Sequence, residues 1–350
     1  MRLRNAVLAI AAGATGAALA GAAAGVAHQR RVIAHRDAGE RVAFGSLRSP
    51  ALTVVADDGV PLHVEVDEPA PRVDGATAPA PTVVFVHGYA LNLDCWHFQR
   101  AAYRGQLRTV LYDQRSHGRS GRSTEEHATI EQLGSDLARV LEEVVPEGPV
   151  VLVGHSMGGM SVIALAESHP ELFGDRVVGV ALISTTAGGL EPHRVLVPMV
   201  PRTLGGQVAV RVVAALARGH RVVEGFRRIG RPLALVATDQ FAFGSDVPER
   251  YVAFVDEMLS RTPFDVLADF FPAFGGLDKF ALLDALGTVP TTIACGTKDR
   301  ITAIGHSRKL HAHIEGSRLE EFEDAGHMVI MERHAAVNEL LDDLIEAAVA

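Results

Sequence analysis

The sequence predicts an α/β protein in which a mostly parallel sheet is flanked by helices and carries one helical insertion. Three observations lead to this fold class. Short, wholly apolar runs recur without polar alternation, as in strands buried on both faces. Stretches with helical spacing of apolar residues lie between these runs. One long stretch, residues 191–277, contains no clear buried strand and is too long for a simple connection, so we expect it to form a helical lid.

The strands are expected in chain order as a hairpin followed by a parallel series. Residues 51–55 and 62–66 flank the turn Asp57-Asp58-Gly59, and two short runs around an Asp-Gly turn predict a β-hairpin. The apolar runs expected as buried strands are 82–86, 109–112, 150–153, 178–183 and 291–294, with a final strand at 318–323.

Helices are expected between and after these strands. Thr129 and Gln132 have the spacing of a capping box, and the apolar residues behind them recur at helical intervals. Residues 160–168 and 335–348 also read as helices, which supports a sheet covered on both faces. The expected parts of the chain are 1–40 (signal peptide or transmembrane anchor plus linker), 41–190 (first part of the core), 191–277 (lid) and 278–350 (second part of the core).

The first 40 residues differ from the rest in composition. An uncharged apolar run at residues 6–27 is long enough to span a bilayer and is flanked by arginines on both sides. Small residues near its end also fit a signal-peptide cleavage site. An anchor, a cleaved signal and a soluble alanine-rich helix are all open, and the length of the run favours the anchor. We therefore expect the protein to be membrane-anchored or exported.

Composition excludes some classes of protein. The net charge is −9 and no segment forms a long basic patch, so nucleic acid is not an expected partner. Cys95 and Cys295 are the only cysteines, too few for a disulfide framework and without the C-x-x-C spacing of a metal site. Both are expected to be buried thiols.

The strongest functional signal is the pentapeptide Gly154-His155-Ser156-Met157-Gly158. It has the form G-x-S-x-G, follows an expected strand and precedes a helical pattern, which is the context of a nucleophile elbow. A serine on such a strand-to-helix turn is lifted into the pocket at the start of the helix, where the helix dipole favours a developing negative charge. Ser156 is therefore predicted to be a nucleophile. The alternative is a glycine-rich turn with an inert serine.

A second signal lies in His87-Gly88-Tyr89, directly after the expected strand at 82–86. Acyl transfer needs N–H donors aimed at the oxyanion of the tetrahedral intermediate. We expect these donors to be the backbone N–H groups of Tyr89 and Met157. His87 is expected to hold the loop by hydrogen bonds and not to act in catalysis.

Two residues that follow expected strands are candidates for the general base and its acid partner. His327 lies after the final expected strand and before the last helix, a position that suits a general base. Asp299 follows the strand at 291–294, where a buried carboxylate would orient the imidazole. Asp299 could instead be an exposed partner of Arg300. The loop one strand earlier, 184–188, contains no acid, which favours Asp299.

The other histidines are expected to have other roles. His155, inside the elbow, is expected to pack. Four further histidines are expected to face solvent from surface helices: His306, His311, His313 and His334.

Taken in order, these motifs resemble the α/β-hydrolase superfamily, in particular its lid-bearing branch of serine esterases, perhydrolases and C–C hydrolases. The resemblance covers residues 50–350 and rests on 87–89, 113–120, 154–159, 296–299 and 326–327. At Ser116 this chain departs from the glycine usual in relatives, in a turn that we expect to be structural. Relatives that process halides or epoxides use an aspartate nucleophile, so Ser156 argues against both activities.

The predicted function is hydrolysis of a carboxylic ester or related acyl compound through an acyl-enzyme, in the chain order Ser156, Asp299, His327. No metal or organic cofactor is required, and the expected partner is a small, apolar ester. Peracid formation, as in perhydrolases and haloperoxidases, and cleavage of a carbon–carbon bond are alternatives on the same triad. A non-catalytic, membrane-associated ligand-binding module is a further alternative, which the intact triad argues against.

Overall fold

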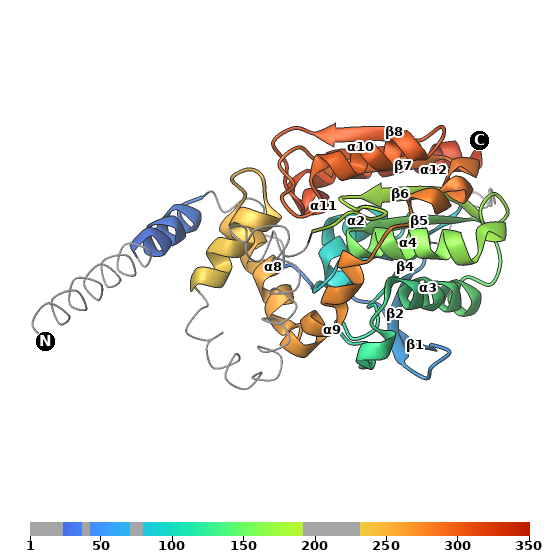
Figure 1. Ribbon diagram of the computed structural model, residues 1–350, viewed down its shortest axis with the longest axis horizontal. Helices are drawn as coiled ribbons and strands as arrows, with labels where there is room; N and C mark the ends of the chain where they lie inside the picture. The colour runs from blue at the N-terminus through green and yellow to red at the C-terminus, as the bar shows by residue number, and fades with distance from the viewer. Residues whose placement is uncertain (1–23, 37–42, 71–79, 192–231) are drawn as a thin grey trace, which may run out of the picture.

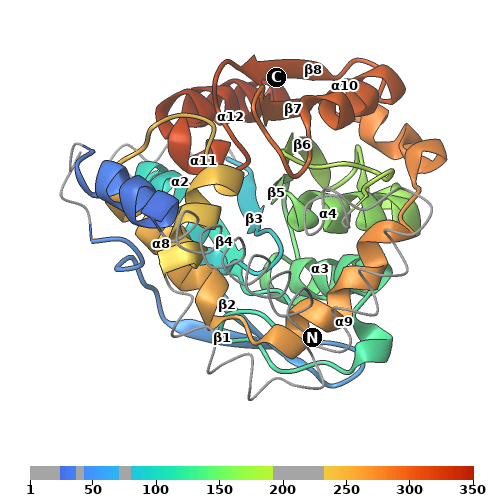
Figure 2. The same ribbon diagram turned by 60° about the vertical axis from the view of Figure 1, so that its left-hand side comes forward.

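The computed structural model describes residues 24–36, 43–70, 80–191 and 232–350. Its strands form one eight-stranded sheet in the order β1-β2-β4-β3-β5-β6-β7-β8, which can be followed from bottom to top in Figure 2. Only the pairs β1–β2 and β2–β4 are antiparallel. The strands are β1 Ala51–Val55, β2 Pro61–Asp67, β3 Thr82–Val86, β4 Thr109–Tyr112, β5 Val150–His155, β6 Val177–Ile183, β7 Thr291–Gly296 and β8 Arg318–Phe322.

Two helices cover residues 24–34 and 232–242, and the labelled helices and short 3-10 turns lie between the strands and after them. The helices are α2 His97–Tyr103, α3 Ile130–Val144, α4 Met157–Ser168, α8 Glu249–Arg261, α9 Phe264–Gly275, α10 Ile304–His313, α11 Val329–Glu332 and α12 His334–Val349. The 3-10 turns are η1 Leu93–Trp96, η2 Glu125–His127, η3 Pro170–Leu172, η4 Phe280–Leu282 and η5 Asp284–Thr288. The predicted α/β fold with a mostly parallel sheet and flanking helices is confirmed.

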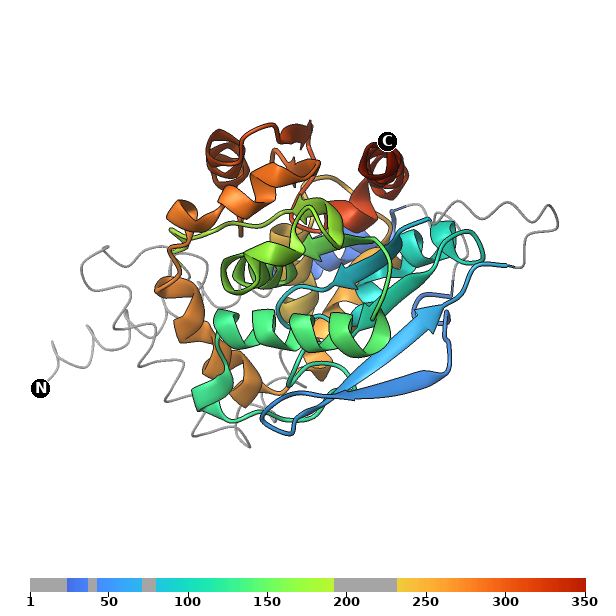
Figure 3. The ribbon, with the colours of Figure 1, turned by 90° about the vertical axis from the view of Figure 1, so that its right-hand side faces the viewer.

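Two apolar layers hold helices against the two faces of the sheet. Successive side chains of a strand point to opposite faces. Accordingly, Val83 and Phe85 of β3 pack in one layer with α12, and Val84 and Val86 pack in the other with α3. Figure 3 shows α12 on one side of the strands and α3 on the other. The uninterrupted apolar runs of the sequence therefore reflect burial on both faces.

Local sequence signals account for where several elements begin and end. Helix α3 starts after Thr129, whose side chain accepts a hydrogen bond from the Gln132 N–H, as the capping pattern predicts. Helix α4 starts at Met157, three residues before the predicted start at Met160. The prediction missed this first turn because its glycines carry no helical periodicity of apolar residues.

The insertion between β6 and β7 is helical over its described part, as predicted. It contains a helix at residues 232–242, then α8 and α9. Pro248 and Pro263 stand at the N-caps of α8 and α9, where a missing N–H costs no helical hydrogen bond. Residues 192–231 of the predicted lid lie outside the described residues. That residues 191–277 form a lid stays a prediction.

The described part of the N-terminal segment packs against this insertion. In Figure 1 the helix at residues 24–34 lies beside the helix at 232–242. Ile33 is fully buried in the same apolar layer as Val236 of that helix. The guanidinium of Arg36 pairs with the carboxylates of Asp239 and Asp246. Residues 24–36 therefore contribute to the folded core.

Most of the predicted apolar run at residues 6–27 lies outside the described residues. Within the described residues, no helix has both the length and the apolar character needed to cross a membrane. The expectation of an anchor or signal peptide stays a prediction.

Candidate active site

Ser156 lies on a strained turn between β5 and α4. Its backbone angles are φ 53° and ψ −120°, a conformation that L-residues rarely adopt. The turn closes only because its neighbours lack side chains: a Cβ on Gly158 would lie 2.0 Å from the carbonyl oxygen of Val86, and one on Gly154 would lie 2.6 Å from that of Gly158. The strand-turn-helix context predicted for Ser156 is therefore present.

The loop after β3 lies directly against this turn. A Cβ on Gly88 would be 3.1 Å from the Cβ of Ser156. His87 holds the loop, because its Nε2 accepts from the N–H of Gln114 at 2.9 Å and its Nδ1 donates to the carbonyl of Gly88 at 2.8 Å. Burial lowers the pKa of His87 to about 3, which keeps the ring neutral. This is the loop-holding role expected from the sequence.

The backbone N–H groups of Tyr89 and Met157 flank Ser156 on these two segments. Neither group donates a hydrogen bond to any other group in the described part of the chain. Met157 is the first residue of α4, where N–H groups have no partner within the helix. Both donors are therefore available to a negatively charged oxygen placed next to Ser156.

Asp299 and His327 are hydrogen-bonded to each other. The Nδ1 of His327 lies 2.9 Å from Oδ2 of Asp299. The other carboxylate oxygen accepts from the N–H groups of Ile301 and Thr302 at 2.8 and 2.9 Å. Burial opposes ionisation of this carboxyl, but the charge and hydrogen bond of His327, together with these N–H donors, lower its pKa to about 2. Asp299 is thus a buried, charged acceptor and not an exposed partner of Arg300.

His155 connects the nucleophile turn to the His327 loop. Its Nε2 donates to the backbone carbonyl of His327 at 3.0 Å, and the two rings lie 4.9 Å apart. Burial lowers the pKa of His155 to about 3, so the ring stays neutral. From the sequence, His155 was expected only to pack. Nothing local in the sequence reveals this contact, because it joins residues 172 positions apart.

Thr302 is a further member of the site and was not predicted from the sequence. Its hydroxyl lies 2.8 Å from Oδ2 of Asp299 and 3.3 Å from Nδ1 of His327. Its hydroxyl also donates to the carbonyl of Ser184, 118 residues away, so only its place in the turn that Asp299 closes over the N–H groups of Ile301 and Thr302 is a local signal.

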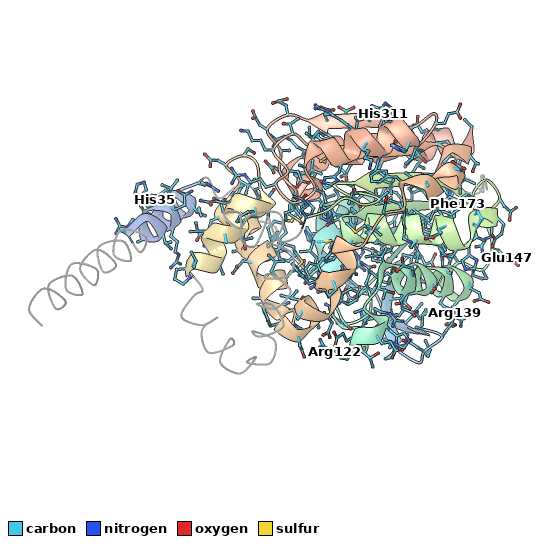
Figure 4. All side chains as sticks on the ribbon, viewed as in Figure 1. His35, Arg122, Arg139, Glu147, Phe173 and His311 are labelled. Atoms are coloured by element: carbon cyan, nitrogen blue, oxygen red, sulfur yellow. The ribbon has the colours of Figure 1, made fainter. Side chains whose placement is uncertain are left out.

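The four histidines that were expected to face solvent divide into two groups. His311 and His313 are exposed on α10, as expected, and Figure 4 shows His311 on the outer surface. The expectation was wrong for the other two, which are only partly exposed. His306 lies 3.0 Å from the hydroxyl of Thr186, and His334 stacks on Phe98 at 3.9 Å.

The turn that contains Ser116 is structural, as expected. Ser116 has φ 65°, and its hydroxyl accepts from the N–H of Ser123. The buried carboxylate of Asp113 accepts from the N–H groups of Leu93 and Arg119, both at 2.8 Å. Serine in place of glycine is therefore held by its own side-chain hydrogen bond.

Cys95 and Cys295 are both free and buried, as expected. Cys295 lies 3.7 Å from Asp299, and burial together with this carboxylate raises its pKa to about 12. It is therefore a neutral thiol. The described residues contain no cluster of three or more His, Cys, Asp or Glu side chains able to hold a metal ion.

Comparison with known families agrees with this geometry. A family model described as "Alpha/beta hydrolase family" matches residues 83–340. The chain belongs to the alpha/beta hydrolase family. The matched part of this alpha/beta hydrolase runs from β3 into α12 and includes Ser156, Asp299 and His327.

Individual relatives of this alpha/beta hydrolase are distant. An uncharacterized protein of Mycobacterium bovis is 27% identical over 71% of this chain and 70% of its own length. The crystal structure of the enol-lactonase from Burkholderia xenovorans has a TM-score of 0.65 and 25% identity, covering 84% of this chain and 100% of that one. A thermophilic esterase from Thermogutta terrifontis has a TM-score of 0.63 and 21% identity, covering 86% of this chain and 100% of that one.

Proposed function

We propose that the protein is a serine hydrolase that cleaves a carboxylic ester or a related acyl compound. Ser156 is the nucleophile, His327 the general base and Asp299 the residue that orients the base. The main support is the chain of contacts from Asp299 to His327, and from the His327 carbonyl to His155, the neighbour of Ser156.

The orientation of the imidazole decides which nitrogen acts. Because Nδ1 of His327 is engaged by Asp299, Nε2 is the atom left to take the proton of Ser156. The serine oxygen then attacks the acyl carbon, and the N–H groups of Tyr89 and Met157 stabilise the oxyanion. His327 passes the proton to the leaving alcohol. It later activates a water molecule, which releases the acid and restores Ser156.

The apolar side chains around Tyr89 and Met157, the proposed oxyanion donors, favour an apolar substrate. Met157 belongs to an apolar cluster with Phe270 and Phe274 of α9, and Tyr89 packs against it. The Tyr89 hydroxyl also donates to the carbonyl of Leu267 in α9. We therefore propose that residues 191–277 act as a lid that shapes an apolar acyl or alcohol pocket. The similarity to an enol-lactonase supports a carboxylic ester, open or cyclic, as the substrate class.

The proposal is tested by labelling Ser156 with a fluorophosphonate and assaying p-nitrophenyl esters of graded chain length. We expect labelling and hydrolysis in the wild type and in Ser168→Ala, a control at the far end of the same helix, and neither in Ser156→Ala. A wild-type protein that is folded but neither labelled nor active would overturn the proposal and favour a binding module. Peracid formation from hydrogen peroxide and an acyl donor would favour the perhydrolase alternative. Cleavage of a vinylogous diketone would favour the C–C hydrolase alternative.

We also propose that the apolar run at residues 6–27 anchors the protein in a membrane or directs its export. The contacts of Ile33 and Arg36 set the design of the test, because a deletion through residue 40 would also remove part of the core. A deletion of residues 1–23 should release the protein from the membrane fraction while leaving ester hydrolysis intact. Unchanged membrane association after this deletion would contradict the proposal.

A further inference from the structure

A buried carboxylate outside the proposed triad joins the His327 loop to the insertion. Glu332 is the last residue of α11, and its side chain is fully buried. Its two oxygens accept from the backbone N–H groups of Gly326 at 2.8 Å, Gly244 at 3.1 Å and Ser245 at 2.8 Å. One side chain therefore accepts hydrogen bonds from the residue before His327 and from the segment that follows the helix at 232–242.

These two segments are also in direct backbone contact. The N–H of Met328 donates to the carbonyl of Ala242 at 2.8 Å. A Cβ on Gly326 would lie 2.4 Å from the nitrogen of Gly244, and one on Gly244 would lie 2.5 Å from the carbonyl oxygen of Asp324. Such close approach fixes the register of the two segments. It also brings their N–H groups together on a single acceptor.

The hydrogen bonds make this arrangement sensitive to the chemistry at position 332. Unpaired polar groups inside a protein are costly, because they lose their hydrogen bonds to water. The Ser245 hydroxyl is a fourth donor to Glu332, and Arg333 lies 3.8 Å from the same carboxylate oxygen. Four donors on two segments therefore depend on one side chain that accepts without donating.

We propose that Glu332 is a positioning residue that sets the place of His327 relative to the insertion. The catalytic consequence rests on the proposed function above, in which His327 is the general base. Glu332 acts through Gly326, the residue next to His327 in the chain. The His327 loop is thereby held by the insertion as well as by Asp299. The loop and the insertion then move as one unit.

The test is Glu332→Gln, which keeps the size of the side chain but turns one acceptor into a donor facing N–H groups. For a short p-nitrophenyl ester we expect kcat to fall about tenfold to a hundredfold, because small displacements of a reacting group are costly. KM should change by less than about threefold, because the interaction acts on the base and not on substrate binding.

Glu65→Gln is the matched control. Glu65 is also a buried carboxylate that accepts from a backbone N–H, that of Ser49, but it lies on β2 and pairs with Arg100. This variant should lower the melting temperature without changing kcat at a temperature where it is folded. An equal loss of kcat in both variants, or a normal kcat in Glu332→Gln, would overturn the positioning role.

A second measurement does not depend on activity. Amide hydrogen exchange at residues 242–246 and 324–328 should be faster in Glu332→Gln than in the wild type, and unchanged in Glu65→Gln. Unchanged exchange in Glu332→Gln would show that the carboxylate does not hold the segments together. If exchange rises but the wild type is neither labelled nor active on esters, the proposed function fails while the structural coupling stands.

Discussion

The turn that carries Ser156 and the loop that carries His327 meet in the structure but are held by different interactions. The turn is fixed by close backbone packing, in which Gly154 and Gly158 leave no space for a side chain. The loop also packs closely against Gly244, but polar side chains hold it as well: Asp299 and His155 from distant segments, and Glu332 from the helix that follows the loop. The turn should therefore be sensitive chiefly to volume, whereas the loop should be sensitive to charge and hydrogen bonding as well.

The largest expected effect is the loss of the Asp299 carboxylate. In Asp299→Asn the amide has nearly the same shape but neither charge nor a fixed acceptor for Nδ1 of His327. We expect kcat on esters to fall about ten-thousandfold, as when the acid of such a triad is neutralised. Asp324→Asn is the control. Asp324 lies near the same loop, but its carboxylate is exposed and pairs with Lys298. A fall in kcat of less than about tenfold in Asp299→Asn would contradict the proposed role.

The nucleophile turn is tested by adding one methyl group. In Gly158→Ala the new Cβ would lie 2.0 Å from the Val86 carbonyl oxygen, so the free energy of unfolding should fall by about 3 kcal/mol. Gly275→Ala is the control, because nothing lies within 4 Å of its Cβ position. Urea unfolding of both variants measures the difference. Equal stability of the two variants would mean that the turn can relax and is not held by volume.

The same division explains what the sequence could predict. The strands at 82–86 and 109–112 were predicted to the residue, because burial on both faces leaves an uninterrupted apolar run. The context of Ser156 was also predictable, because strand, glycines and helix are adjacent in the chain. The positions of Asp299 and His327 followed from the strands that precede them.

The parts that escaped prediction depend on contacts between distant residues. Glu332 gives no sign in the sequence that it is buried, because its partners Gly244 and Ser245 lie 88 and 87 residues away. The link from His155 to His327 is equally non-local. Ile33 sits near the end of an alanine-rich stretch whose composition suggested a separate segment, yet it belongs to the core.

Ile33 packs against the insertion, which in turn contacts the His327 loop, so it tests whether the N-terminal segment contributes to holding the insertion in place. In Ile33→Ala a fully buried side chain is removed beneath the insertion, and the free energy of unfolding should fall by about 2–4 kcal/mol. The neighbouring Val32 is 40% exposed, so Val32→Ala should change the free energy of unfolding by less than about 0.5 kcal/mol. Denaturant unfolding compares the two variants. Equal effects would mean that residues 24–36 do not brace the insertion.

Acid titration separates the two kinds of interaction directly. The pKa of Asp299 is lowered from 3.8 to about 2 in the folded protein, so its ionised form contributes stability that is present above pH 3.8 and lost as the pH falls through about 2. This contribution is about 2 kcal/mol. The difference in unfolding free energy between wild type and Asp299→Asn should therefore shrink by that amount between neutral pH and pH 2. The difference between wild type and Gly158→Ala should stay constant over the same range, because a steric clash carries no proton. A constant difference for Asp299→Asn would mean that the His327 loop, like the turn, is held by packing and not by charge.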